Sequence, residues 1–477
     1  MDAQKIIERA VDDRYREELI GLSRKIWELA EVGYEETRSA ETLCEALEHH
    51  GFAVTRHLVD IPTAFKGVWG KGRPVVGILG EYDALPGLSQ EAGCPVKKPE
   101  HEGCPGHGCG HNLLGTGALA GALALKDYLE ETGKPGTVVY FGTPAEENLS
   151  GKAFMARDGA FDGVDFFLTW HPAPENCTAT PHLNANVCRT YKFKGITSHA
   201  GGAPELGRSA LDSCEIMGVG ANYLREHVIM EARIHYAYLD VGGRAPNVVQ
   251  DHAAVRYVVR APYYRQVKEI VPRLDDVARG AALICGTQVT VERESGYSEY
   301  INNKVLAQAA TEAFHAIGAP QWDDRDFALA KAFTDSFSDS MKTKEKDMIL
   351  KRYGRDRLEE KLARPLDTEI KDFDPDREEL DFGSTDVGDV GFIAPTYYFN
   401  VATEALGTPG HSWYKTGRVN SSIGQKGMLT AGKVIALTAV KVLEAPALLA
   451  AAKEEFQAKN NGQYDCPVAG VEKLPKL

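Results

Sequence analysis

Four short apolar runs, each followed by a glycine, proline or polar cluster, constrain the fold of this chain more than any other feature. They cover residues 74–79, 137–141, 164–170 and 396–401. Apolar runs of this length without polar alternation are typical of parallel strands buried on both faces. Helical patterns separate them, and segment 112–131, rich in Ala and Leu, suits a buried helix lying on a sheet. The sequence predicts an α/β fold, with a mostly parallel sheet flanked by helices on both faces.

A second pattern interrupts the first. Residues 189–194 and 253–260 alternate as half-buried strands do, and 209–226 between them has the pattern of an amphipathic helix. A chain of 477 residues is also too long for one hydrophobic core. Because the buried-strand pattern resumes at 396–401, we expect an α+β domain inserted within the first. The predicted domains are therefore 1–187 with 305–477, and 188–304.

A highly charged stretch, residues 323–376, is expected to form exposed helix with a solvated face. The whole chain is acidic, with 54 Lys and Arg against 68 Asp and Glu and a formal net charge of -14. Such a charge repels phosphate backbones and anionic lipid surfaces, so no nucleic-acid or membrane partner is expected.

The sequence shows no pattern typical of an exported or membrane-spanning protein. The first twenty residues carry charges throughout and predict a helix, not an export signal. The apolar stretch 434–451 is interrupted by Lys441, Glu444 and Pro446, so it is too short to span a membrane. Nine cysteines, an odd number, favour reduced thiols or metal ligands over a disulfide framework. The sequence predicts a cytoplasmic protein.

Potential metal ligands occur in four groups, each at or just after the end of an apolar run or at the start of a helix. These groups are Cys109 with His111, Glu146 with Glu147, His171, and His411. Open α/β sheets bind their ligands at the carboxyl ends of strands. Adjacent side chains such as Glu146 and Glu147 diverge, so one can hold a metal while the other faces its water. One histidine alone is weak support, but four such groups together favour a metal site.

Five segments resemble the amidohydrolase branch of the aminoacylase/carboxypeptidase metallopeptidase superfamily, in order and over nearly the whole chain. They are GEYDALPG (80–87), GCGHNLLG (108–115), GTPAEE (142–147), TSHAGGAPELGRSALD (197–212) and GGRAPNVV (242–249). The resemblance implies a catalytic domain that holds two divalent ions, zinc or manganese. It also implies an inserted lid domain that forms a dimer, either a homodimer or a heterodimer with a related subunit.

The resemblance also assigns roles to single residues. The implied metal ligands are Cys109, His111, Glu147, His171 and His411, and Glu146 is the implied general base. In this branch the cysteine stands where other members of the superfamily use a bridging carboxylate. The chain departs from the superfamily at Glu81-Tyr82-Asp83, where many members have His-x-Asp. Glu81 cannot supply that imidazole, and Asp83 is expected to orient a ligand from behind it.

In the inserted domain, His199 matches a lid histidine that in relatives reaches the active site of a partner subunit and steadies the oxyanion. Asn247 and Arg260 match lid positions that contact substrate, with the Arg260 guanidinium gripping a carboxylate. A salt bridge on the strand surface is the alternative for Arg260. Asp386 also belongs to a family-like motif, but a helix cap explains it about as well.

The expected function is metal-dependent hydrolysis of an amide bond in N-acyl or aryl-amide amino acid conjugates, foremost those like p-aminobenzoyl-glutamate. Glu146 would take the proton of the attacking water, and His199 would stabilise the oxyanion. Two alternatives stay open. One is a cysteine hydrolase with Cys109 as nucleophile. The other is a non-catalytic or partner-dependent metal-binding subunit.

Overall fold

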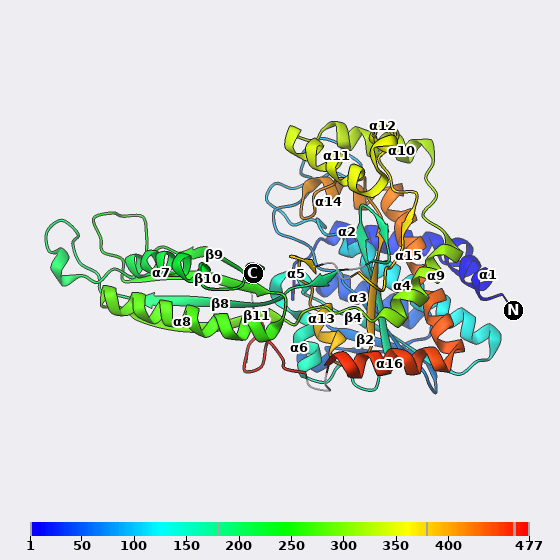
Figure 1. Cartoon of the computed structure of the whole chain (residues 1–477), viewed down its shortest axis with the longest axis horizontal. Coiled ribbons are helices and arrows are strands. Elements are labelled where there is room, and N and C mark those ends of the chain that lie inside the picture. The colour runs from blue at the N-terminus through cyan, green and yellow to red at the C-terminus, as the bar shows by residue number, and fades with distance from the viewer. Residues whose placement is uncertain (1, 180, 378–379, 461–463, 476–477) are drawn as a thin grey trace.

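An eight-stranded sheet forms the centre of the larger body of the molecule (Figure 1). The computed structural model describes residues 2–179, 181–377, 380–460 and 464–475. In sheet order the strands are β1 (Ala53–Arg56), β2 (Phe65–Lys71), β4 (Gly136–Gly142), β3 (Val75–Gly80), β5 (Phe166–Ala173), β14 (Thr396–Ala402), β6 (Asn176–Cys177) and β12 (Ile370–Lys371). A separate two-stranded ribbon pairs β7 (His182–Leu183) with β13 (Leu380–Asp381).

The four central strands, β4, β3, β5 and β14, run parallel to one another. They are the four strands predicted from the apolar runs, with ends that differ by three residues at most. The edge strand β1 and its neighbour β2 were not predicted; β1 pairs antiparallel with β2, and β2 pairs antiparallel with β4. The predicted α/β class, with a mostly parallel sheet, is confirmed.

Helices cover both faces of this sheet because alternate strand residues point to opposite sides. In β4, Val138 and Tyr140 pack into one core cluster, whereas Val139 and Phe141 pack into another. The helices that supply the first cluster are α1 (Ala3–Glu8), α2 (Arg16–Leu29), α3 (Thr37–His49), α4 (His111–Thr132), α9 (Lys304–Ile317), α15 (Ser422–Glu444) and α16 (Pro446–Asn460). Those that supply the second are α6 (Gly151–Arg157) and α13 (Val387–Gly391).

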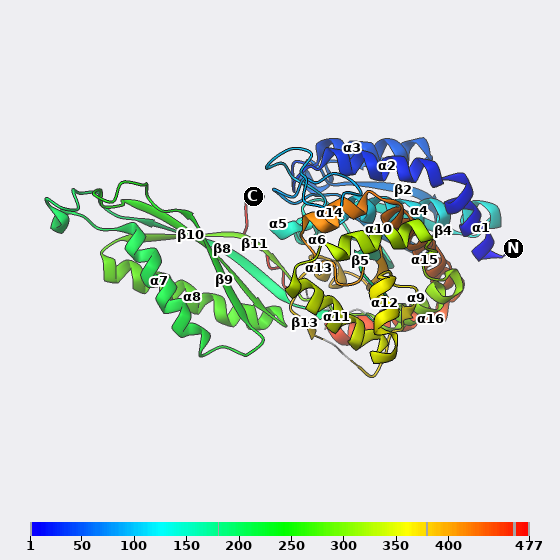
Figure 2. The ribbon, with the colours of Figure 1, turned by 90° about the horizontal axis from the view of Figure 1, so that it is seen from above.

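A four-stranded antiparallel sheet extends from this body as an arm (Figure 2). Its strands, in sheet order, are β11 (Gln288–Tyr297), β8 (Ala185–Lys194), β10 (His252–Ala261) and β9 (Arg233–Asp240). Helices α7 (Ala210–Arg225) and α8 (Tyr264–Cys285) cover one face and share a core of their own with it. The arm begins at β8, three residues before the predicted start at 188. Its edge strand β9 exposes most of its side chains.

The charged stretch forms α10 (Asp324–Asp335), α11 (Asp339–Tyr353) and α12 (Leu358–Ala363), which lie beside α14 (Trp413–Val419) in Figure 1. These helices have exposed charged faces, but they also bury apolar residues, among them Phe333 and Ile349, and Lys351 lines a cavity of the body. In the part of the chain that the structure describes, no single helix is long and apolar enough to cross a membrane. The pair α15 and α16 passes together on length and composition, but it is bent by 100°.

Candidate metal centre

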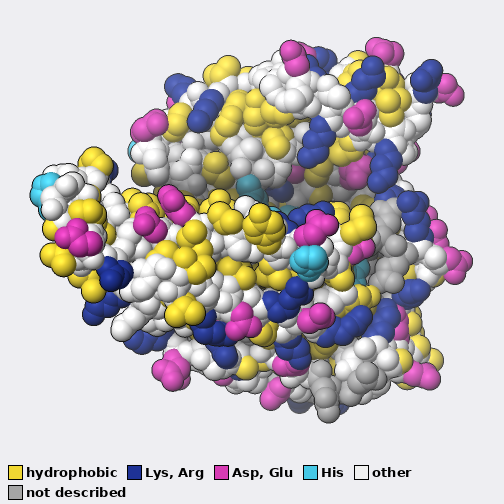
Figure 3. Space-filling view, turned by 60° about the vertical axis from the view of Figure 1, so that its left-hand side comes forward, with side chains coloured by type: hydrophobic (Ala, Val, Ile, Leu, Met, Phe, Trp, Pro, Cys, Tyr) yellow, Lys and Arg dark blue, Asp and Glu magenta, His cyan; other side chains and the backbone are white. Residues whose placement is uncertain are grey.

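A cavity of about 610 Å³ opens at the carboxyl ends of the central strands. Its lining includes Cys109, Glu146, Glu147, His171 and His411 from the body and Arg260 from the arm. The molecular surface is deeply hollowed in the space-filling view, with a histidine side chain in the hollow (Figure 3). The cavity is therefore where a parallel sheet is expected to bind its ligand.

Unusual backbone conformations present several of these side chains. Gly110, before His111 at the start of α4, has φ +87°, and a Cβ there would meet Pro172 at 3.0 Å. Ala145 adopts φ 59° immediately before Glu146, and His411 itself adopts φ 50°. Left-handed backbone at non-glycine residues costs free energy and concentrates at functional sites.

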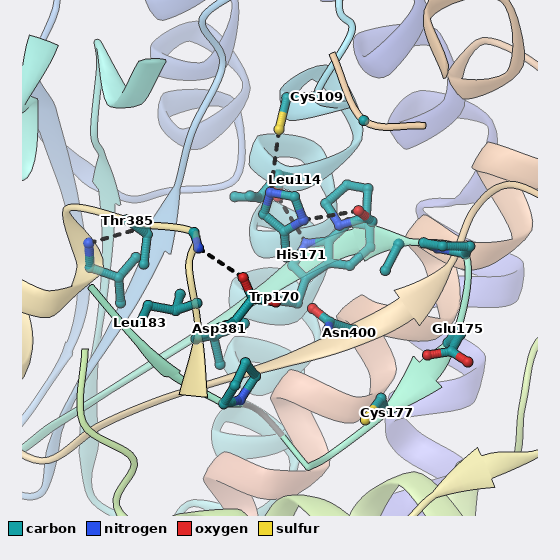
Figure 4. A pocket seen from close by; sticks show the side chains of 18 of the residues that line it. Cys109, Leu114, Trp170, His171, Glu175, Cys177, Leu183, Asp381, Thr385 and Asn400 are labelled. Atoms are coloured by element: carbon teal, nitrogen blue, oxygen red, sulfur yellow. Dashed lines mark hydrogen bonds between the residues drawn. The ribbon is translucent and has the colours of Figure 1, made fainter. Parts of the chain in front are cut away.

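The five predicted ligands form two groups that share one member. Cys109, His111 and His171 offer ligand atoms that all lie within 4.8 Å of one another, and so do Cys109, Glu147 and His411. The Cys109 Sγ lies 3.5 Å from His171 Nε2 (Figure 4). His411 Nε2 lies 3.5 Å from Glu147 Oε2. Cys109 is thus common to both groups, as a ligand shared by two ions would be.

Hydrogen bonds made by the Nδ1 atoms of His111 and His171 orient both imidazole rings, so that Nε2 of each faces the other candidate ligands. His111 Nδ1 donates to Asp83 Oδ1 at 2.7 Å, and His171 Nδ1 donates to the Pro172 carbonyl at 2.9 Å. Asp83 Oδ2 also accepts the backbone N–H of Glu147 at 2.9 Å. A carboxylate or carbonyl behind an imidazole is the usual support of a metal-binding histidine.

Two orphaned atoms test whether these residues fit a metal. Glu147 Oε1 is buried and has no hydrogen-bond partner in the described part of the chain, and buried His111 Nε2 has none there beyond its ion-pair contact with Glu81. Buried polar atoms without a partner are costly. One group offers a sulfur and two nitrogens, and the other offers a sulfur, a nitrogen and an oxygen. Zinc and other divalent ions accept such donor sets, with a position left for water. The residues therefore fit two divalent ions.

The sequence missed a role for Glu81, which it treated only as a lost imidazole. Glu81, His111 and Glu146 form a third group of ligand atoms within 4.8 Å of one another. Glu81 Oε2 lies 3.2 Å from His111 Nε2. Burial, and then the neighbouring carboxylates of Glu81 and Glu147, raise the pKa of Glu146 well above its usual range. A carboxyl group with a raised pKa suits a proton carrier near neutral pH.

Lys152, also missed, neutralises part of this acidic cluster. Its buried Nζ lies 2.7 Å from Glu81 Oε1 and 2.6 Å from Asp386 Oδ1. Although burial opposes it, the charges of Asp386 and Glu81 raise the pKa of Lys152 above its usual value. Asp386 stands at the N-cap position of α13 but makes no capping hydrogen bond with its side chain. Asp386 therefore does not cap its own helix; its carboxylate pairs with the Lys152 ammonium and accepts the Lys152 backbone N–H in the first turn of α6.

Replacing Lys152 with methionine is expected to destabilise the protein by about 3–5 kcal/mol, because two buried carboxylates lose their cation. The measurement is the denaturant midpoint of the metal-free protein. Lys331→Met is the control, since Lys331 pairs with Asp335 on an exposed helix face and should contribute at most about 1 kcal/mol. Equal midpoints for the two variants would contradict a stabilising role of the buried cation.

The state of the Cys109 thiol bears on the cysteine-hydrolase alternative. Burial, and then the charge of Glu147, raise the pKa of Cys109 to about 12. A nucleophilic cysteine needs a lowered pKa to be a thiolate at neutral pH. Coordination to a metal deprotonates a thiol outright. The environment of Cys109 therefore suits a metal ligand and disfavours a nucleophile.

Of the three residues predicted in the inserted domain, the structure places one at the cavity and two away from it. Arg260 lines the cavity and donates to Ser384 Oγ at 3.2 Å. His199 and Asn247 lie at the opposite end of the arm, where the Ala200 N–H donates to the Asn247 carbonyl. There the His199 Nδ1 accepts backbone N–H groups of its own loop. Neither His199 nor Asn247 lines the cavity of its own chain.

Comparison with known proteins gives this geometry a context. The model of peptidase family M20/M25/M40 matches residues 77–337. The chain is 40% identical over 469 residues to a subunit of p-aminobenzoyl-glutamate hydrolase from Escherichia coli (strain K12), covering 97% of each chain. It is 30% identical to the Xaa-Arg dipeptidase of Mus musculus, covering 94% of this chain and 90% of that one.

Among solved structures, the fold resembles a dinuclear metal binding peptidase from the M20 family of Bacillus subtilis. The TM-score is 0.56 at 18% sequence identity, over 90% of this chain and 99% of the other. At that identity the likeness shows the fold alone.

Proposed function

The chain belongs to peptidase family M20/M25/M40, and from this premise we propose that it hydrolyses amide conjugates of amino acids that resemble p-aminobenzoyl-glutamate. It is a metal-dependent enzyme that acts on amide bonds. The observation that carries the proposal is the sharing of Cys109 between two three-residue groups beside Glu146. The relative that covers 97% of the chain is named for this substrate.

The residues that would hold the ions are the two groups that share Cys109. When bound, two divalent ions, which we propose to be zinc or manganese, act as Lewis acids and lower the pKa of a water. Glu146 lies within the cavity next to Glu147 in sequence. It takes a proton from the attacking water and returns it to the leaving nitrogen. The Lys152 ammonium pairs with Glu81 beside Glu146 and offsets part of the negative charge of the cluster.

Substrate binding falls to the rest of the cavity. A volume of about 610 Å³ is within the range of pockets that hold drug-sized ligands, and so it can contain an aryl-amide amino acid. Arg260 enters it from the arm and supplies a planar donor for a carboxylate of the substrate. This position supports the carboxylate-binding role over a strand-surface salt bridge, since Arg260 pairs with no carboxylate of the described residues.

We propose that residues 188–304 form a lid and a dimer contact, in a homodimer or in a heterodimer with a related subunit. The arm has an open edge strand, and Tyr236, Tyr238 and Leu239 on β9 are exposed, as is Tyr223 on α7. An unpaired edge with apolar side chains is suited to pairing with a second chain. His199, remote from its own cavity, would then reach the cavity of the partner and stabilise the oxyanion.

A homodimer of this kind predicts complementation between two inactive variants. His199→Ala should inactivate the site it serves in the other chain, and Glu146→Gln should inactivate its own site. Co-expressed, the two chains should form mixed dimers in which one of the two sites has both residues intact. Activity of purified mixed dimers, against near-zero activity of each parent dimer, is the measurement. No recovery in a proven mixed dimer would contradict the shared site.

The function itself is tested with the purified chain alone, loaded with zinc or with manganese. A panel of N-acyl and aryl amides of single amino acids, followed by product mass, should show cleavage of the amide bond, and a chelator should abolish it. Failure of the loaded chain on every amide, with recovery when a related subunit is added, would favour the alternative of a partner-dependent metal-binding subunit.

A further inference from the structure

Two arginines lie directly opposite each other where the arm meets the cavity. Arg233 on β9 and Arg260 on β10 are paired in the register of the antiparallel sheet. Their strand neighbours Ile234 and Val259 are buried under the helices of the arm, so both arginines point to the uncovered face. Like charges directly opposite on neighbouring strands are destabilising. An arrangement with this cost needs an anion that offsets it.

No carboxylate of the described residues supplies that anion. Arg233 donates to the carbonyls of Met230 and Ala232, and Arg260 donates to the Ser384 hydroxyl. The Arg260 Nε is buried without a hydrogen-bond partner. Neither guanidinium forms an ion pair within the described part of the chain.

Two other arginines of the four-stranded sheet form ion pairs with carboxylates of the arm. Arg189 binds Asp275, and Arg256 lies 2.7 Å from Glu294. Arg189 and Arg256 are thus neutralised by carboxylates of the arm, whereas Arg233 and the cavity-lining Arg260 have no such partner among the described residues.

Phe382 connects Arg233 to the cavity. The Arg233 guanidinium lies 4.5 Å from the centre of the Phe382 ring, which is 48% exposed. The residues on either side of Phe382, Asp381 and Gly383, line the cavity, and Figure 4 shows Asp381 among its lining side chains. Stacking fixes the guanidinium plane without using its N–H groups, and the two carbonyl hydrogen bonds use only Nη1, so Arg233 keeps donors on Nη2 beside Phe382.

We propose that Arg233 determines substrate specificity by binding a second carboxylate, while Arg260 binds the first. The substrates are then amides of a dicarboxylic amino acid, glutamate or aspartate, with both carboxylates on the amine side of the scissile bond. This inference rests on the proposed function and narrows it. It also separates the chain from the relative named Xaa-Arg dipeptidase, because a cationic substrate side chain would be repelled by two arginines.

The test compares N-acyl-glutamate with N-acyl-glutamine carrying the same acyl group, on the full-length metal-loaded protein. Wild type should favour glutamate by about 100-fold in kcat/KM, since a site built for a charged partner rejects the analogue that lacks it. Arg233→Met should reduce that preference to about threefold by lowering the rate on glutamate alone. The ratio is informative because misfolding or loss of metal lowers both rates together.

Arg225→Met is the matched control. Arg225 is also exposed, but it lies on α7 and donates to the Ile234 carbonyl from the helix-covered side. It should keep the full preference for glutamate. The inference is overturned if Arg233→Met keeps the wild-type preference, if Arg225→Met loses it equally, or if wild type cleaves both amides alike. Cleavage of neither amide by loaded wild type would overturn the proposed function, and the inference with it.

Discussion

Replacing Glu146 with glutamine is expected to lower kcat by about 10³-fold or more while the protein keeps its full metal content. The amide is nearly the same size as the carboxylate, so packing in the cavity should persist. What is lost is the group that takes the proton of the attacking water, and positioned general acid–base groups contribute about 10²–10⁴-fold. Glu146 belongs to neither group that shares Cys109, so both sets of ligands remain intact. Steady-state kinetics and metal analysis of the same sample measure the two quantities.

The adjacent residue gives the control. Glu147→Gln makes the same chemical change one position along the chain, but Glu147 belongs to the group with Cys109 and His411. It should lose metal from that group and lose activity for that reason. If Glu146→Gln lost metal, or kept a rate within about tenfold of wild type, the assignment of Glu146 as the base would be wrong.

Much of the fold could be predicted because the burial of a strand determines the hydrophobicity of consecutive residues in the sequence. The central strands β3, β4, β5 and β14 are buried on both faces, so nearly every residue in them is apolar. Each therefore appears in the sequence as a continuous apolar run, and this made the four strands predictable. The edge strand β1 and its neighbour β2 were missed because each is only partly buried, so neither forms a continuous apolar run. The candidate ligands were predicted from their places at strand ends and from the family resemblance, and the structure brings their ligand atoms together.

The buried ion pairs of Lys152 with Glu81 and Asp386 could not be predicted from a local sequence pattern. Lys152 and Asp386 are 234 residues apart in sequence, and each is surrounded by residues that a helix or a turn would also carry. Only the folded sheet brings α6 and α13 together and buries the pair. Arg233 was missed for a related reason, since its significance lies in its register with Arg260 and in the absence of a carboxylate partner within the described residues.

Replacing Cys109 with alanine is expected to remove bound metal from both positions, because its sulfur is the one donor that the two groups share. Loss of a supporting residue behind a ligand already weakens metal binding by about 10–100-fold, and loss of a ligand common to two ions should weaken both by more. Activity should fall to background. Metal analysis after dialysis, together with calorimetric titration of zinc or manganese into the metal-free protein, measures the effect. The control is Cys177→Ala, a buried thiol that lines the same cavity but belongs to neither group.

Cys109→Asp distinguishes a bridging ligand from a nucleophile. A carboxylate can bridge two ions, so this variant should recover part of the metal content and a measurable rate that Cys109→Ala lacks. A cysteine hydrolase would gain nothing from the aspartate, because the mechanism requires a thiolate that attacks the carbonyl. The raised pKa of Cys109 already argues against that mechanism in the metal-free protein. Full metal content in Cys109→Ala, with activity lost in both variants, would instead assign the thiol to attack on the substrate.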